Sequence, residues 1–277
     1  MVELDLMPEI EGDLVVAREV DCELIRVESV MGDAVLLTLT APDAVVTQLR
    51  AVQFVDVLCR LPGFFDPLLR RPYSVYRVDT TGSTLTLLVR PFGRGSAWLA
   101  SRPVGTVLNV LGPLGNRFEI APRSNNLLLV AGGVGAAPLV MLAHDAVQRG
   151  LNVTFLMGAA DVSGLLPTAE LPGPVEYQTA TDNGTMGHHG FVTELVTDYL
   201  VWADQVFACG PEAMFLSLRR VVQANRPGTK PTVQVSVERD MACGLGACLG
   251  CVVETRAGLR TSCVQGPIYD MEEVIWE

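Results

Sequence analysis

The stretch "LLLVAGGVGAAPLVML", residues 127–142, carries the strongest single indication of the fold. Its apolar run over 127–131 has the length of a buried strand, and a glycine turn and a helical segment follow it. Open α/β sheets bind dinucleotides at such a strand, turn and helix. The usual third glycine is replaced, with Ala137 and Pro138 at the helix start. The glycines of the turn are Gly132, Gly133 and Gly135.

Strand and helix patterns alternate through residues 126–225. The predicted strands are 126–133, 152–158 and 205–210, and the predicted helices are 136–150, 190–200 and 212–225. This alternation indicates βαβ crossovers, which give a parallel sheet with helices on both faces. We therefore expect an α/β nucleotide domain over residues 123–229.

The residues before this domain have a different texture. Short β-branched or leucine-rich runs, such as "VLLTLT", "TLTLLVR" and "VLNVLG", alternate with Gly, Pro and Asp turns. This rhythm predicts an antiparallel β-barrel over residues 15–119, with helical signal confined to about 97–101. A turn-rich linker, 226–232, leads into a cysteine-rich tail over 230–277. The fold class is thus multidomain α+β, and residues 1–14 receive no assignment.

The tail contains "ACGLGACLGC", residues 242–251, and a later cysteine in "TSCVQG". The four cysteines are spaced C-x4-C-x2-C-x11-C, and the first spacings are those of plant-type ferredoxins, where thiolates hold a two-iron two-sulfur cluster. A structural zinc site is the alternative, but such sites usually consist of two short knuckles. The last gap is shorter than in plant-type ferredoxins, which predicts a small ferredoxin-like domain. The candidate ligands are Cys243, Cys248, Cys251 and Cys263.

Two further motifs carry candidate binding residues. "RPYS", residues 71–74, places a cation, an aromatic ring and a hydroxyl along one strand, and Gly95 and Ser96 can open a short helix that takes a pyrophosphate. The alternative for 71–74 is a half-buried strand with a surface arginine. "FACGPEAMF" ends a strand at Cys209, although a buried apolar role is common for a free cysteine.

In this order the motifs resemble the ferredoxin-NADP reductase family, and "MACGLGACLGCVV" with "SCVQGPIYD" is similar to the iron-sulfur electron-transfer subunits of type B dihydroorotate dehydrogenases. The resemblance covers about residues 15–277. It implies FAD on the barrel, NAD on the α/β domain and a two-iron two-sulfur cluster in the tail. It also implies a separate FMN-containing dihydroorotate dehydrogenase catalytic subunit as partner, in a heterotetramer of two plus two that serves pyrimidine biosynthesis.

The resemblance implies a role for each motif. Arg71 would bind the FAD pyrophosphate, Tyr73 would lie against the flavin or ribitol, and Ser74 would hydrogen-bond near flavin N5. Cys209 would stand near the nicotinamide, so Ser74 and Cys209 are the candidate catalytic residues. The diphosphate of FAD would meet Gly95 and Ser96, and that of NAD would meet Gly133 and Gly135. The candidate cofactor-binding residues together are Arg71, Pro72, Tyr73, Ser74, Gly95, Ser96, Gly132, Gly133, Gly135, Cys209 and Gly210.

Charge and composition limit the partners. The net charge of -11 disfavours nucleic acid, and neither a signal sequence nor an apolar membrane span is indicated, so we expect a cytoplasmic protein. No acid closes the strand "VTFLMGAAD" before Asp161 and no arginine follows it, which favours NAD over NADP. Two other functions remain open: a flavin subunit serving ferredoxin, a hydrogenase or sulfur reduction, and a zinc-stabilised interaction module without catalysis.

Overall fold

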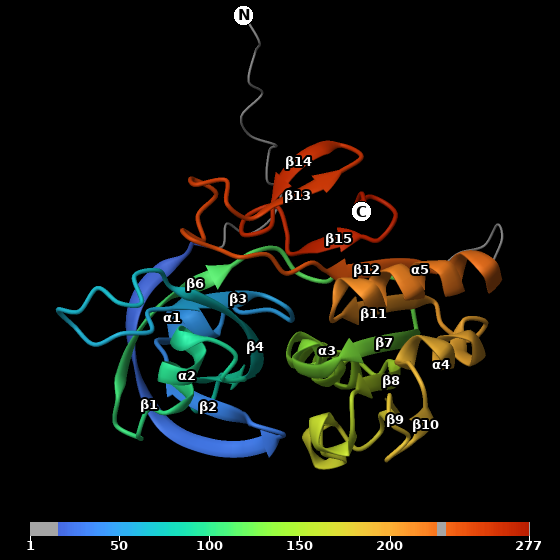
Figure 1. Cartoon of the computed structure of the whole chain (residues 1–277), viewed down its shortest axis with the longest axis horizontal. Helices are drawn as coiled ribbons and strands as arrows, with labels where there is room; N and C mark the ends of the chain where they lie inside the picture. Colours follow the sequence, from blue (N-terminus) through green and yellow to red (C-terminus); the bar gives the residue numbers. More distant parts are fainter. Residues whose placement is uncertain (1–15, 226–230, 277) are drawn as a thin grey trace, which may run out of the picture.

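The computed structural model describes residues 16–225 and 231–276, and the first part of the chain forms a closed antiparallel β-barrel (Figure 1). Its strand order is β1-β2-β5-β4-β3-β6. Val55, Val57 and Val75 are among the side chains that fill the barrel core. The antiparallel barrel predicted from the sequence is therefore confirmed. Its strands are β1 (Arg18–Met31), β2 (Ala34–Thr40), β3 (Phe54–Val57), β4 (Arg71–Asp79), β5 (Thr84–Val89) and β6 (Val107–Leu114).

The barrel carries more helix than the sequence indicated. Helix α2 spans Arg94–Ala100 and so begins three residues before the predicted segment. The one-turn helix α1, Asp43–Val46, was not predicted, because "DAVV" has the β-branched composition of a strand. Val45 and Val46 are nevertheless buried in the barrel core, so tertiary packing decides the local conformation.

The second part is a seven-stranded sheet in the order β10-β9-β8-β7-β11-β12-β15. All neighbouring pairs are parallel except β12 and β15. The strands predicted from the sequence correspond to β7, β8 and β11, whereas β9, β10, β12 and β15 were not predicted. The strands are β7 (Asn126–Gly132), β8 (Asn152–Ala159), β9 (Glu176–Thr181), β10 (His188–His189), β11 (Gln205–Cys209), β12 (Thr232–Ser236) and β15 (Ile268–Asp270).

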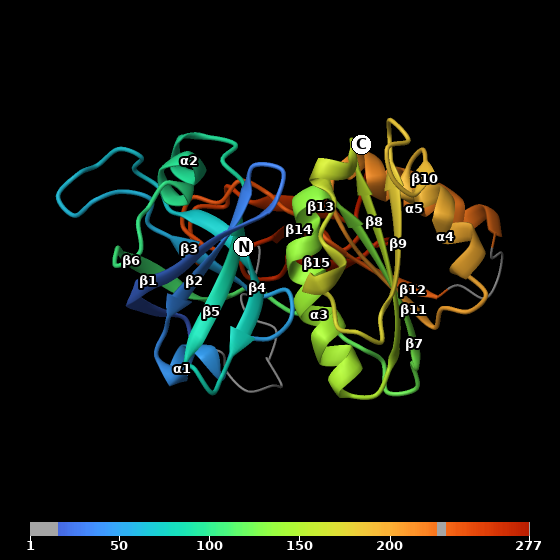
Figure 2. The ribbon, with the colours of Figure 1, turned by 90° about the horizontal axis from the view of Figure 1, so that it is seen from below.

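Helices cover both faces of this sheet, as predicted. Leu127 and Leu129 of β7 belong to the same core as α3, whereas Leu128 and Val130 belong to the core that contains α4 and α5. Figure 2 shows α3 between the barrel and the sheet. The helices are α3 (Ala136–Gln148), α4 (Val192–Tyr199) and α5 (Glu212–Asn225), and short 3-10 turns occur at η1 (Gly133–Gly135), η2 (Val162–Gly164) and η3 (Thr168–Glu170).

The C-terminal tail lies across the junction of barrel and sheet (Figure 1). Its strands β12 and β15 extend the nucleotide sheet, and β13 (Val252–Thr255) and β14 (Gly258–Thr261) form a separate hairpin. Asn116, just after β6, ties the tail to the barrel, because its side chain accepts from Ile268 N at 2.8 Å and donates to Gln265 O at 3.0 Å. Most of the predicted linker, residues 226–230, lies outside the described residues.

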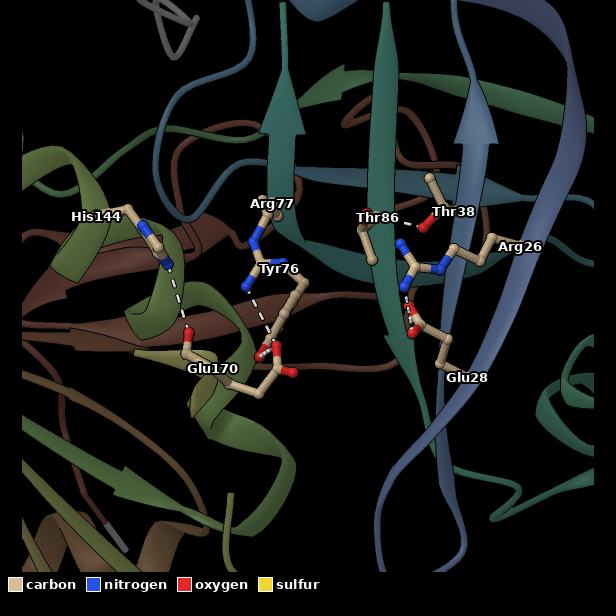
Figure 3. Close-up of polar contacts among 8 residues, drawn as sticks. All are labelled: Arg26, Glu28, Thr38, Tyr76, Arg77, Thr86, His144 and Glu170. Atoms are coloured by element: carbon tan, nitrogen blue, oxygen red, sulfur yellow. Dashed lines mark hydrogen bonds and ion pairs between the residues drawn. The ribbon is translucent and has the colours of Figure 1, made fainter. Parts of the chain in front are cut away.

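A partly buried polar contact joins the barrel to the nucleotide domain (Figure 3). Tyr76 Oη donates to Glu170 Oε2 at 2.9 Å, and Arg77 Nη2 lies 3.1 Å from the same oxygen. His144 of α3 lies 3.4 Å from the Glu170 carbonyl, and burial lowers its pKa. Tyr76 is fully buried, which raises its pKa above the ordinary value. The two domains therefore have a fixed contact through β4, α3 and η3.

Candidate functional site

The start of β4 and the start of α2 meet at the candidate flavin site. A Cβ placed on Gly95 would lie only 3.0 Å from Arg71 Cγ, so a glycine lets the helix approach the arginine. The Arg71 guanidinium donates to Leu69 O at 2.9 Å and to Arg70 O at 3.0 Å, which fixes its direction. Ser96 Oγ accepts from Gly93 N at 2.9 Å and caps α2, so this side chain is already occupied by the backbone.

Tyr73 and Ser74 point to different sides of β4. Tyr73 packs against the barrel core, and its hydroxyl is buried without a hydrogen-bond partner in the described part of the chain. Burial raises the pKa of Tyr73, and the Cys59 thiol beside it acts in the same direction. Ser74 is half-buried and pairs with Phe54 of the neighbouring strand β3. The alternation expected for the "RPYS" strand is thus present.

The glycine turn and Cys209 meet at the carboxyl edge of the sheet. Gly133 has φ of +54°, which favours glycine, and a Cβ on Gly135 would lie 2.4 Å from Cys209 O. Gly132 and Gly210 are equally restricted, since a Cβ would lie 2.8 Å from Pro211 Cδ in the first case and 2.7 Å from Met214 Cε in the second. These contacts pack the glycine turn tightly against the ends of β11 and α5. The first turn of α3 is buried, whereas Val134 of the glycine turn is exposed.

Cys209 has a carboxylate neighbour that the sequence did not reveal. Its Sγ lies 3.9 Å from Glu238 Oε1, and burial raises the pKa of both groups. Glu238 as a residue is exposed, yet its carboxyl group faces the fully buried sulfur. Because Cys209 pairs with Ser236 of β12, a side chain two residues beyond Ser236 reaches the same edge. A prediction of strand β12 would therefore have identified Glu238 as a neighbour of Cys209.

Backbone amides surround the sulfurs of the cysteine loop. Gly246 N donates to Cys263 Sγ at 3.1 Å, and Leu245 N donates to Cys243 Sγ at 3.4 Å. Similar bonds of 3.4 Å reach Cys248 Sγ from Gly250 N and Cys251 Sγ from Cys263 N. None of the seven cysteines, all of which lie among the described residues, forms a disulfide. Amides directed at sulfur are a feature of iron-sulfur ligand loops, so these residues fit such a cluster.

The protonation of the loop cysteines follows from these contacts. The Leu245 amide lowers the pKa of Cys243 to about 7, whereas burial raises the pKa of Cys263 to about 12. Within 16–225 and 231–276, no three Cys, His, Asp or Glu side chains converge closely enough to hold one metal ion. A two-iron cluster with four cysteines needs only two thiolates on each iron. The lack of a three-ligand group among the described residues is therefore compatible with such a cluster.

The cysteine loop packs on β3, the barrel strand that pairs with β4. Cys251 and Cys263 are 2% and 1% exposed and form a small buried cluster with Phe54 of β3 and Leu114 of β6. Phe54 in turn pairs with Ser74 of β4. Phe54, which packs with the cysteine loop, is therefore on the strand that is hydrogen-bonded to the strand of Ser74.

Two cavities in the described part of the chain have other linings. They have volumes of about 990 and 830 Å³, and Arg50 and Arg117 line both. The first borders the beginnings of β11 and β12, at Gln205 and Thr232, and so lies at the edge of the sheet opposite Gly133. Neither contains Ser74, Cys209 or a cysteine of the loop in its lining.

The comparisons with known proteins agree with this arrangement. Residues 238–275 match a family model described as the iron-sulfur cluster binding domain of dihydroorotate dehydrogenase B. The electron transfer subunit of dihydroorotate dehydrogenase B (NAD(+)) from Desulforamulus reducens is 34% identical over 220 residues, which cover 76% of this chain and 82% of that protein. The same subunit from Geobacillus kaustophilus is 36% identical over 215 residues, with 76% and 81% covered.

A solved structure, that of an NADH-dependent reduced ferredoxin-NADP oxidoreductase studied for flavin-based electron bifurcation, has a TM-score of 0.78 and 26% identity. The match covers 96% of this chain and 92% of that one. Fold and site together define a ferredoxin-reductase-like protein with an added cysteine domain. The chain belongs to the family of electron transfer subunits of dihydroorotate dehydrogenase B. Among the described residues, no helix is long and apolar enough to cross a membrane.

Proposed function

We propose that this chain carries electrons from a dihydroorotate dehydrogenase catalytic subunit to NAD, by way of an iron-sulfur cluster in the tail and FAD on the barrel. Family membership supports both the activity and the existence of a catalytic partner. The observation that carries the proposal is the contact of Cys251 and Cys263 with Phe54, which pairs with Ser74. It brings the ligand loop and the flavin strand together in one packed unit.

The cluster supplies single-electron transfer, and FAD supplies the exchange between single electrons and the hydride that NAD accepts. The chain provides the binding groups. We assign the cluster to Cys243, Cys248, Cys251 and Cys263, whose sulfurs accept hydrogen bonds from backbone N–H groups. Arg71 and the Gly95 amide would hold the FAD diphosphate, with the Ser96 side chain serving the helix cap instead.

The remaining residues orient the reacting rings. Ser74 would donate its hydroxyl to flavin N5, and the turn with Gly133 and Gly135 would hold the NAD diphosphate at the start of α3. Cys209 lies at the same edge as that turn and would border the nicotinamide. The Glu238 carboxyl group, 3.9 Å from Cys209 Sγ, would border the same position.

The finer assignments are also part of the proposal. We assign FAD to residues 15–119, NAD to 123–229 and the cluster to 230–277. We further propose that the catalytic subunit contains FMN and that two copies of each subunit form a heterotetramer. The cysteine loop would face that partner, since it is the entry point for electrons.

A reconstitution experiment tests this function. The chain is mixed with the candidate catalytic subunit from the same organism, dihydroorotate and NAD⁺, and NADH formation is followed. We expect NADH only when both subunits are present, and co-elution of the two in gel filtration. NADH oxidation coupled to ferredoxin, with no turnover of dihydroorotate by the pair, would contradict the proposal and favour a ferredoxin reductase.

A further inference from the structure

A buried carboxylate lies between the barrel and the cysteine loop. Asp56 of β3 is 1% exposed, and its Oδ1 has no hydrogen-bond partner in residues 16–225 and 231–276. Because side chains alternate along a strand, Asp56 shares the face of Phe54, whereas Val55 and Val57 fill the barrel core. Asp56 therefore points out of the barrel, on the side that contacts the tail.

Its neighbour on that side is the ligand loop itself. A Cβ placed on Gly244 would lie 2.3 Å from Asp56 Oδ2, and Gly244 has φ of +70°. Gly244 directly follows Cys243, a proposed cluster ligand. Asp56 also pairs with Pro72 of the flavin strand β4. One carboxylate is thus in contact with the ligand loop and paired to the strand that would carry FAD.

The surroundings do not neutralise this carboxylate. Arg70 is the cation that acts on it, but Arg70 Nη1 donates to the backbone carbonyls of Asp56 at 3.4 Å and of Asn109 at 3.2 Å. Arg70 Nη2 lies 3.1 Å from Glu19 Oε1, and the structure records no ion pair between Arg70 and the Asp56 carboxylate in the described residues. Burial raises the pKa of Asp56 to about 6, and Arg70 acts in the opposite direction. A buried charge without a close partner is unfavourable for folding, and another residue would pack there at lower cost.

We propose that Asp56 is a positioning residue that sets the reduction potential of the cluster. Its negative charge, held in a poorly screened position beside the ligand loop, disfavours the extra electron on the reduced cluster. A cluster held by the loop would therefore have a lower reduction potential and would be a stronger electron donor. This inference rests on the proposed assignment of the cluster to the four cysteines.

The experiment is a redox titration of the intact chain with its cluster, followed by the electron paramagnetic resonance signal of the reduced cluster at pH 8. Asp56→Asn keeps the size of the side chain and removes its charge. Asp240→Asn is the matched control, because it removes the same charge from an exposed position three residues before Cys243. Asp56→Ala is a second variant that removes the charge without adding an amide to be satisfied.

We expect Asp56→Asn to raise the potential, with about a tenfold higher ratio of reduced to oxidised cluster at the wild-type midpoint, or ~59 mV for a one-electron couple. Asp240→Asn should leave that ratio within about twofold, because solvent screens the charge. Equal shifts in the two variants, or none, would overturn the inference. Loss of the cluster in both Asp56 variants would also overturn it, in favour of a structural anchor. Absence of any cluster signal in the wild type would instead sink the proposed function.

Discussion

At the two proposed nucleotide sites, the position of each candidate residue depends on a close contact with one neighbouring residue. Gly95 leaves room beside Arg71, the residue that we propose binds FAD, and Gly135 is required because Cys209 O lies so close. The residue types could be predicted from their motifs. Their mutual contacts could not, since these depend on how β4 meets α2 and how β7 meets β11.

Replacing Arg71 with Ala should weaken FAD binding by about 1.5–3 kcal/mol, because a charge-assisted contact to the diphosphate is lost. The measurement is flavin content after extensive dialysis, together with fluorescence titration of rebound FAD. Arg94→Ala is the control, because Arg94 lies on α2 and not on β4, and its side chain is exposed and paired with Asp66. Equal flavin retention in wild type and Arg71→Ala would refute this role.

The stability of the chain should depend on pH through Asp56. An aspartate ordinarily ionises near 3.8, whereas burial raises the pKa of Asp56 in the folded chain to about 6. Between these values the folded state holds a proton that the unfolded state has released, so stability decreases as the pH rises. Asp56→Asn should therefore stabilise the protein by roughly 2–3 kcal/mol at pH 8 and much less at pH 4.5.

Thermal melting of Asp56→Asn and wild type at the two pH values measures this difference. Asp240→Asn again provides the control, since this carboxylate is exposed. A gain in melting temperature that is the same at pH 8 and pH 4.5 would contradict the argument, because it would come from packing and not from ionisation.

At the scale of elements, the long periodic segments were predictable and the edge strands were not. β7, α3 and α5 have strong apolar patterns, and the structure contains them where the sequence placed them. β9 reads "EYQTAT" and β15 has three residues, so neither carries a pattern of its own. Pairing with a neighbouring strand forms them, and that neighbour is distant in the sequence or unpredictable from it.

The cysteine loop is an element whose contribution can be removed separately. Cys248→Ser should abolish the absorbance and the iron of the cluster but leave FAD bound, since Cys248 is exposed whereas Arg71 lies on β4. Iron, sulfide and flavin are quantified in the purified protein. Iron and sulfide at the wild-type ratio would show that this sulfur is not a ligand.

The turn after β8 should decide the choice of nucleotide. Asp161 there accepts from Ser163 N at 2.8 Å, and its hydrogen bonds with Ser163 lower its pKa, so the group is anionic. Arg149 is paired with Asp145, and Arg219 with Glu272. We expect NADH to be preferred over NADPH by at least tenfold in kcat/KM, or roughly 1.4 kcal/mol, because the 2'-phosphate would meet Asp161 without a cation.

Dye reduction by each nucleotide at equal ionic strength measures this preference. Asp161→Asn should reduce the ratio of kcat/KM for NADH to kcat/KM for NADPH. Asp145→Asn, near the C-terminal end of α3, should leave that ratio unchanged. Equal efficiencies for the two nucleotides in the wild type would show that a cation from elsewhere reaches the phosphate.

At the scale of the whole molecule, the tail is the part that the sequence described least well. Its cysteine spacing indicated the cluster, but nothing in the spacing showed that β12 and β15 would extend the nucleotide sheet. The proposed boundary at 229 and 230 therefore separates functions within one continuous sheet. This sharing places the cysteine loop against β3 and β6 of the barrel, next to the strand that we propose for FAD.

The central claim is the order NAD, FAD, cluster along this arrangement, and anaerobic reduction by NADH tests it most directly. The signal of the reduced cluster is recorded after NADH is added to the intact chain and to the same chain stripped of FAD. The account predicts a cluster signal in the intact chain, none in the stripped chain, and recovery when FAD is restored. A cluster that NADH reduces equally well without FAD, or never reduces although the flavin bleaches, would contradict it.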